Sequence, residues 1–73
     1  MKSLSEAAVG DSVSVCGLLA KDYAKERMLA LGITRGAKIE VLRRGPKNNL
    51  SVFAIRGAMI ALRREEAEKI LVT

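Results

Sequence analysis

The sequence predicts a mainly β protein, a small barrel of about five short strands with one inserted α-helix and a short helical turn near the C-terminus. Apolar residues alternate over short runs, turn-forming residues separate these runs, and helical spacing occurs in one longer stretch. A chain of 73 residues has room for one core, so we expect residues 1–73 to form a single domain. So short a sheet must close or be covered to hide its edges.

The first strand is predicted over Ser12–Leu18. Gly10 and Asp11 signal a turn, after which Val13 and Val15 alternate with small polar residues and are expected to face the core. Within this strand, Cys16 is expected to be a small buried or half-buried residue.

The inserted helix is predicted to begin at Asp22, whose carboxylate is expected to act as the N-cap. Apolar side chains recur there at helical spacing, at Ala24, Met28 and Leu31. Gly32 can take the left-handed conformation that ends a helix, and Ile33 would then pack back onto Met28 in a Schellman closure. Leu29 lies about 100° around the helix from Met28, so we expect it to be partly exposed.

Two strands joined by a hairpin should follow. The tight turn Thr34–Gly36 leads into a strand over Ala37–Arg44, in which inward-facing apolar residues alternate with charged ones. The segment Gly45–Asn49 is the strongest turn signal in the chain, because it combines glycine, proline and asparagine. It is expected to connect to a strand over Leu50–Arg56.

This Leu50 strand is apolar on both faces. Phe53 and Ile55 point to one side, and Leu50, Val52 and Ala54 point to the other. Such a strand is either buried on both sides or binds another molecule.

The C-terminal part predicts a further strand and a helical turn. Gly57 permits a tight reversal into a strand over Ala58–Arg63. Acidic residues at the start of Arg64–Ile70 and a lysine near its end match a helix dipole. Leu71 and Val72 can pair as a last short strand.

Composition limits the function more than it defines it. Thirteen Lys and Arg against eight Asp and Glu give a net charge of +5, which favours an anionic partner such as nucleic acid, a phospholipid surface or an acidic protein patch. Histidine is absent and Cys16 is the only cysteine, so we expect no enzyme activity, no cofactor and no metal site. Glu65, Glu66 and Glu68 form the densest carboxylate group, which we interpret as a solvated first helical turn.

No signal-peptide or membrane-spanning stretch is evident, which predicts a cytoplasmic protein without direct membrane insertion.

Several segments resemble the FeoA family of ferrous iron transport proteins. They are Arg27–Gly36 (RMLALGITRG), Ala37–Pro46 (AKIEVLRRGP) and Ile55–Val72 (IRGAMIALRREEAEKILV), with Leu4–Glu6 and Gly10 in addition. No single motif is specific, but their order and spacing extend over nearly the whole chain.

The resemblance implies an SH3-like β-barrel with helical additions. It also implies a cytosolic accessory protein of FeoB, the membrane ferrous iron transporter with a cytosolic GTPase domain, which would hold this chain at the inner face of the membrane. Similar modules form the C-terminal part of metal-dependent repressors, so a regulatory module of that type is an alternative. The chain departs from the family at four positions. Family members commonly have polar residues where this chain has Val52 and Ala54, and they usually have larger aromatic and basic residues where it has Ala58 and Met59.

These observations define candidate partner-binding residues in three groups. The first is an apolar strip of Leu50, Val52, Ala54 and Met59. The second is the cluster of cations around the hairpin, Arg43, Arg44 and Lys47, and the third is Leu29 alone. FeoB is the expected partner, and self-association through the strip is an alternative. A nucleic-acid-binding barrel is less favoured, because Tyr23 and Phe53 are the only aromatic residues for base stacking.

Overall fold

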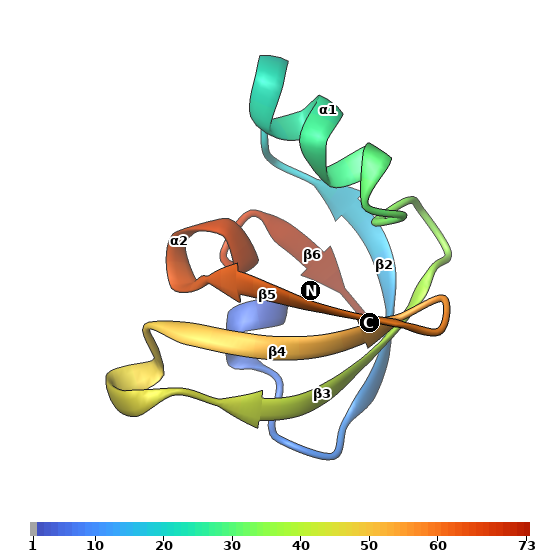
Figure 1. Cartoon of the computed structure of the whole chain (residues 1–73). Helices are drawn as coiled ribbons and strands as arrows, with labels where there is room; N and C mark the ends of the chain where they lie inside the picture. Colours follow the sequence, from blue (N-terminus) through green and yellow to red (C-terminus); the bar gives the residue numbers. More distant parts are fainter. Residues whose placement is uncertain (1) are drawn as a thin grey trace.

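Six antiparallel strands in the order β1-β6-β2-β3-β4-β5 form the sheet of the computed structural model, which describes residues 2–73 (Figure 1). The strands are β1 (Lys2–Ser3), β2 (Ser12–Leu18), β3 (Lys38–Arg44), β4 (Leu50–Ile55), β5 (Ala58–Arg63) and β6 (Ile70–Val72). The helices are α1 (Asp22–Ala30) and α2 (Arg64–Ala67), and the short 3₁₀ helices are η1 (Leu4–Glu6) and η2 (Pro46–Asn48). The predicted mainly β class is confirmed.

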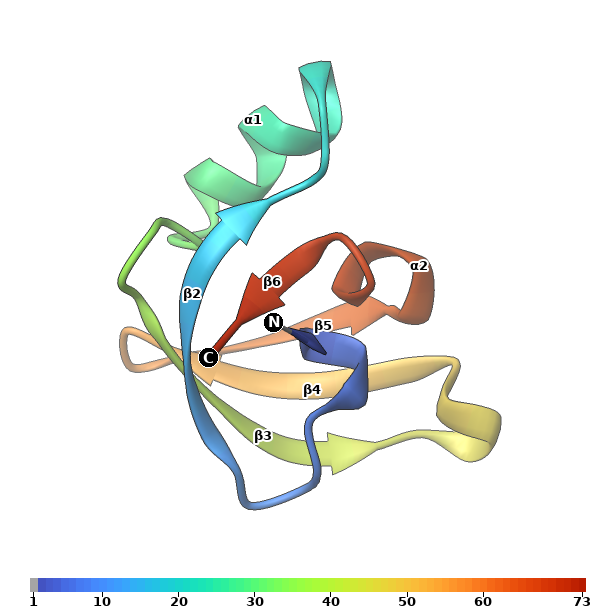
Figure 2. The same cartoon turned by 180° about the vertical axis from the view of Figure 1, so that it is seen from behind.

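Strand β2 belongs to both halves of the sheet. Its first part, Ser12–Ser14, pairs with β3, and its second part pairs with β6 after a register shift between Val15 and Gly17. A bulge bends a strand and increases its twist. The bend in β2 therefore lets the sheet curl around one small core, with α1 projecting beyond the end of β2 in both views (Figure 1 and Figure 2).

The core follows the alternation predicted from the sequence. The inward residues of β2, β3 and β4 are fully or almost fully buried, namely Val13, Val15, Ile39, Val41, Phe53 and Ile55. Residues of the other elements complete it, among them Leu4, Met28, Ile33, Leu62, Ile70 and Val72. Ser51 is the one buried polar residue in the part of the chain that the structure describes.

Helix α1 ends as predicted but begins differently. The Ile33 amide donates to the Met28 carbonyl at 3.0 Å, and the Gly32 amide donates to the Leu29 carbonyl at 3.0 Å, which is the Schellman pattern. The prediction of Asp22 as N-cap is wrong. Lys21 occupies the N-cap position with no side-chain cap, and Asp22 is the first helical residue with φ of 54°.

The apolar spacing of α1 overstated how much of the helix is buried. Ala24 is exposed and Leu31 is only partly buried, so that Met28 is the buried residue of this helix. Helix α1 is thus fixed to the barrel mainly through its C-terminal turn.

The N-terminal strand was not predicted. Lys2 and Ser3 pair with Val72 and Leu71 of β6, which extends the sheet to six strands rather than about five. Two residues are too short for an alternation to be visible in the sequence. The C-terminal helix is also shorter than expected, ending at Ala67, and β6 begins at Ile70.

The Schellman closure predicts a stability loss for Gly32→Ala. Gly32 has φ of 91°, and an added Cβ would lie 3.1 Å from Cδ of Arg56. Because an L-residue is strained in this left-handed conformation, we expect the free energy of unfolding to fall by about 1–2 kcal/mol. Urea denaturation measures it.

The matched control is Gly17→Ala. Gly17 has no positive φ, and an added Cβ there would meet Leu71 Cδ1 at an ordinary 3.6 Å. This variant should lose no stability, since alanine is intrinsically better than glycine in a strand by roughly 0.5–1 kcal/mol. Equal urea denaturation midpoints for Gly32→Ala and Gly17→Ala would contradict the Schellman closure at Gly32.

Candidate functional site

The apolar strip lies on the outer face of β4 and β5. Ala54 stands directly opposite Met59 in the β4–β5 ladder, and Val52 and Leu50 follow at alternate positions along β4, on the face away from Phe53. Leu50 is 48% exposed and Met59 is 75% exposed. Val52 and Ala54 are half-buried. The four side chains therefore form one accessible apolar surface on a regular part of the sheet.

Charged residues border the strip in the strands on either side. Arg43 of β3 is opposite Val52, and Arg63 of β5 is opposite Leu50, and both arginines are exposed. Glu40 is opposite Ala54 and is also exposed. Two cations and one carboxylate give this face a net positive border, which suits a partner that combines apolar side chains with acidic ones.

Lys47 lies at the tip of the β3–β4 hairpin, in η2. It is exposed and has φ of 57°. The hairpin tip thus places a third cation near the end of the strip where β4 begins.

Arg44 lies apart from the other hairpin cations, because a bulge reverses the faces of β3. The register shifts between Val41 and Arg43, so that Arg43 opposes the outer residue Val52 and Arg44 opposes the buried residue Ser51. The Arg44 guanidinium donates to Ser51 Oγ at 3.1 Å, to the Leu4 carbonyl at 3.3 Å and to the Ala7 carbonyl. Arg44 therefore ties the N-terminal segment to the sheet, which is a structural role.

Leu29 belongs to a different surface from the strip. As the helical geometry predicted, it is partly exposed, at 42%, beside the buried Met28. It borders a hollow of about 350 Å³ between α1 and β2, whose lining residues are Val15, Gly17, Leu18, Lys25, Leu29 and Arg35. The structure thus brings together the strip, Arg43 and Lys47, and leaves Leu29 on α1.

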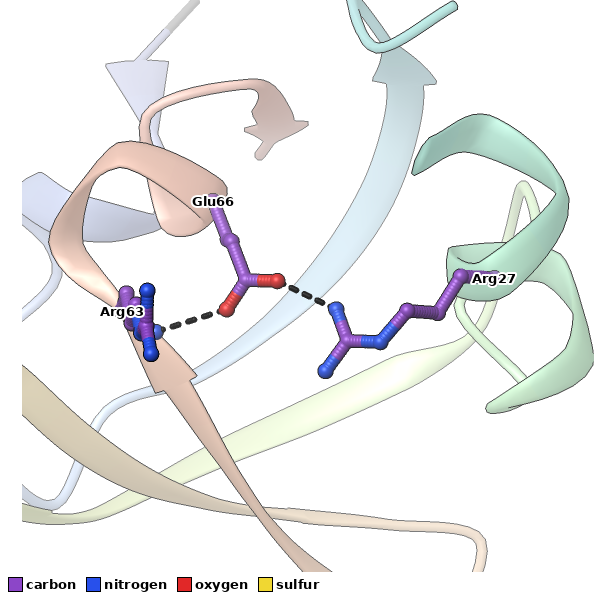
Figure 3. Close-up of polar contacts among 3 residues, drawn as sticks. All are labelled: Arg27, Arg63 and Glu66. Atoms are coloured by element: carbon purple, nitrogen blue, oxygen red, sulfur yellow. Dashed lines mark hydrogen bonds and ion pairs between the residues drawn. The ribbon is translucent and has the colours of Figure 1, made fainter. Parts of the chain in front are cut away.

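Helices α1 and α2 are linked by an ion pair between Arg27 and Glu66 (Figure 3). The second carboxylate oxygen of Glu66 accepts the backbone N–H of Arg63 at 2.9 Å, at the start of α2. The sequence predicts Glu66 to be a solvated residue of a first helical turn. Its partner lies 39 residues away in the chain, so no local pattern could have revealed the pair.

Among residues 2–73, no three His, Cys, Asp or Glu side chains gather in a group that could hold a metal ion. No helix in the same range has the length and apolar character needed to cross a membrane.

A family model described as the FeoA domain matches residues 2–73. Among solved structures, the chain is similar to the FeoA protein of Chlorobium tepidum, with 37% identity and a TM-score of 0.89 over 96% of this chain and 67% of that one. It is also similar to the zinc-complexed FeoA of Stenotrophomonas maltophilia, described as a prokaryotic SH3 domain protein. Identity there is 25% and the TM-score is 0.87, over 100% of this chain and 91% of that one.

The same fold occurs in a regulatory protein. A manganese-dependent transcriptional repressor matches with a TM-score of 0.89 and 23% identity, over 99% of this chain but only 40% of the repressor. At this identity the match shows a common fold and carries no functional argument. No curated protein sequence matches the chain.

The bulge in β3 predicts opposite outcomes for two neighbouring arginines. Arg44→Met removes donors from the Leu4 and Ala7 carbonyls and from Ser51 in a part-buried place. We expect the free energy of unfolding to fall by about 1–3 kcal/mol, as for other buried groups left without a hydrogen-bond partner.

Arg43→Met is the matched control, with the same chemical change one residue away on the exposed face. It should change stability by less than about 0.5 kcal/mol, as for other surface substitutions. Chemical denaturation of both variants measures this, and an equal loss in the two would refute the structural role of Arg44.

Proposed function

We propose that this chain, which belongs to the FeoA family of ferrous iron transport proteins, binds the cytosolic part of the FeoB transporter. The contact would be made through the outer face of β4 and β5. An accessory role in ferrous iron transport follows from the family. The partner, the contact surface and the consequence for transport are the proposal. Under this proposal the chain lies in the cytoplasm, and at the inner face of the membrane when it is bound to FeoB.

One observation carries the choice of surface. The apolar strip is accessible on a strand whose other face is fully buried, so its apolar side chains are not needed for the core. Protein interfaces combine an apolar centre with a polar border, and methionine and arginine are enriched in them. Met59 at 75% exposure and the bordering Arg43 and Arg63 match this composition.

The chain would act by contact rather than by chemistry. It has no histidine, and its one cysteine, Cys16, lies half-buried in β2. A bound protein changes an equilibrium only by the difference between its affinities for the two states. We therefore expect the adaptor to prefer one conformation of the transporter, and the S. maltophilia relative, suggested to be a ferrous iron transport activating factor, fits such a role.

The first test is a titration of the purified protein against detergent-solubilised FeoB at physiological salt, with excess nucleic acid as competitor. We expect saturable binding that survives the competitor, with a change in GTPase rate, nucleotide affinity or iron flux. Binding that nucleic acid removes would favour the basic-barrel alternative, because phosphate contacts dominate such complexes. Unchanged rate, affinity and flux would reject a modulating role.

The strip itself is tested by Val52→Glu. A carboxylate at the centre of an apolar contact would be desolvated on binding, so we expect the affinity for FeoB to fall at least about tenfold, or about 1.4 kcal/mol. Because Val52 is half-buried on the outer face, the variant should still fold, which circular dichroism checks.

Leu19→Glu is the control, since Leu19 is an exposed apolar residue that follows β2 and lies outside the strip. It should bind like the unmodified protein. Leu29→Glu tests the α1 surface in the same assay. Weakened binding for Leu29→Glu alone would move the contact from the strip to the hollow beside α1.

A further inference from the structure

Strand β5 forms a free edge of the sheet. It is last in the strand order and pairs only with β4, over six consecutive residue pairs without a register shift. The other end of the sheet is β1, which has only two residues. Among the described strands, β5 is therefore the one long, regular edge.

The β4–β5 turn decides which backbone groups of β5 point outward. Arg56 and Gly57 have φ of 50° and 81°, as in a two-residue type I′ turn closed by Ile55 and Ala58. The closing pair is hydrogen-bonded, and bonded pairs alternate along an antiparallel ladder. Ala58, Ile60 and Leu62 therefore bond to β4, whereas Met59, Ala61 and Arg63 direct their N–H and C=O groups to the free edge.

Most of these outward groups have no partner in the part of the chain described. The Arg63 N–H donates to Glu66 Oε1 at 2.9 Å. No hydrogen bond from the N–H or C=O of Met59 or Ala61 to another element is present among residues 2–73. Two successive outward residues thus offer a repeating donor and acceptor pattern to an added strand.

The edge also lacks the usual protection against strand addition. Edges are normally blunted by proline, bulges, charged residues or short length. Strand β5 (AMIALR) has no proline, no bulge and one charge, Arg63, at its end. Met59 is 75% exposed on the outer face, and Ile60 is only partly buried on the inner face.

We propose that the β5 edge binds an extended segment of the partner as an additional strand, and that this segment is apolar in its centre and acidic at its ends. The inference rests on the proposed function, because the partner is the same. Backbone hydrogen bonds to Met59 and Ala61 would supply affinity, and alternate side chains would supply specificity. Met59 joins the edge to the apolar strip, so one partner segment can cover both.

Charge favours such a segment over a second copy of the chain. The edge has Arg56 at its turn, where the guanidinium also donates to Thr34 Oγ1 at 2.9 Å, and Arg63 at its other end, and both residues are exposed. Antiparallel pairing of two β5 edges would bring Arg63 of each copy next to the Arg56 turn of the other, between chains of net charge +5. Like charges brought together in this way are destabilising, whereas acidic residues at the ends of a partner strand would pair with the same arginines.

The test uses Ala61→Pro. Proline at this edge position removes an outward N–H and leaves the ladder to β4 intact. We expect affinity for detergent-solubilised FeoB to fall at least about tenfold, with melting and circular dichroism used to check the fold. Ala61→Thr keeps the amide and suits a strand. It should therefore bind at least about tenfold more tightly than Ala61→Pro, which assigns the difference between the two variants to the backbone N–H.

Hydrogen exchange of the unmodified protein gives a second readout that needs no variant. The amides of Met59 and Ala61 should exchange rapidly in the free protein and at least about tenfold more slowly in the complex, whereas the Ile60 amide should be protected in both. If Ala61→Pro does not fold, this measurement decides.

The outcomes separate the two proposals. Normal binding by Ala61→Pro together with unprotected Met59 and Ala61 amides would overturn the edge inference and leave the proposed function standing. Absence of binding by the unmodified protein would overturn both. If the same amides become protected with rising protein concentration alone, and light scattering shows a doubled mass, the edge binds a second copy and the partner segment is rejected.

Discussion

The structure depends on one constraint: a sheet of six short strands must wrap around a single small core without a second layer to cover it. Phe53 and Ile55 of β4 are fully buried inside the sheet, and the bend of β2 brings β6 and β1 around the same core. Because no large helix among residues 2–73 packs on the outer face of β4 and β5, that face keeps the apolar strip accessible. The same arrangement leaves β5 with one unpaired edge.

The peripheral parts are attached to this barrel by a few specific contacts. Helix α1 relies on the buried Met28, the Schellman closure and the ion pair from Arg27 to Glu66. The N-terminal segment relies on β1 pairing and on Arg44. A hydrogen bond such as those of Arg44 contributes about 1 kcal/mol, which matters in a small domain whose total stability is about 5–15 kcal/mol.

These features support the proposal that the protein works by binding a partner. The FeoA family provides the biological setting, and the geometry provides two adjoining surfaces: an apolar strip bordered by Arg43 and Arg63, and the backbone edge of β5. A partner segment that used both would gain side-chain burial and main-chain hydrogen bonds together. The fold shared with a metal-dependent repressor shows that this barrel also occurs as a module of a larger protein.

Local chemistry in the sequence determined the mainly β class, the positions of β2 to β5, the Gly32 helix end and the family. Alternation and turn residues act over a few positions, so they can be read without the fold, and the two faces of the Leu50 strand followed from them directly. The exposure of Leu29 followed from helix geometry in the same way.

Only the tertiary structure decided which cations and edges are available. Alternation through Ile39 and Val41 would place Arg43 inside and Arg44 outside, but the bulge in β3 reverses them. A bulge depends on the partner strand and on the packing of the two strands. The pairing of Arg27 with Glu66, the short β1 and the free edge of β5 likewise depend on how the elements pack together. The ion pair and the β1–β6 pairing join residues far apart in the chain, whereas the bulge and the free edge depend on which strands lie side by side. For these reasons no local pattern contained them.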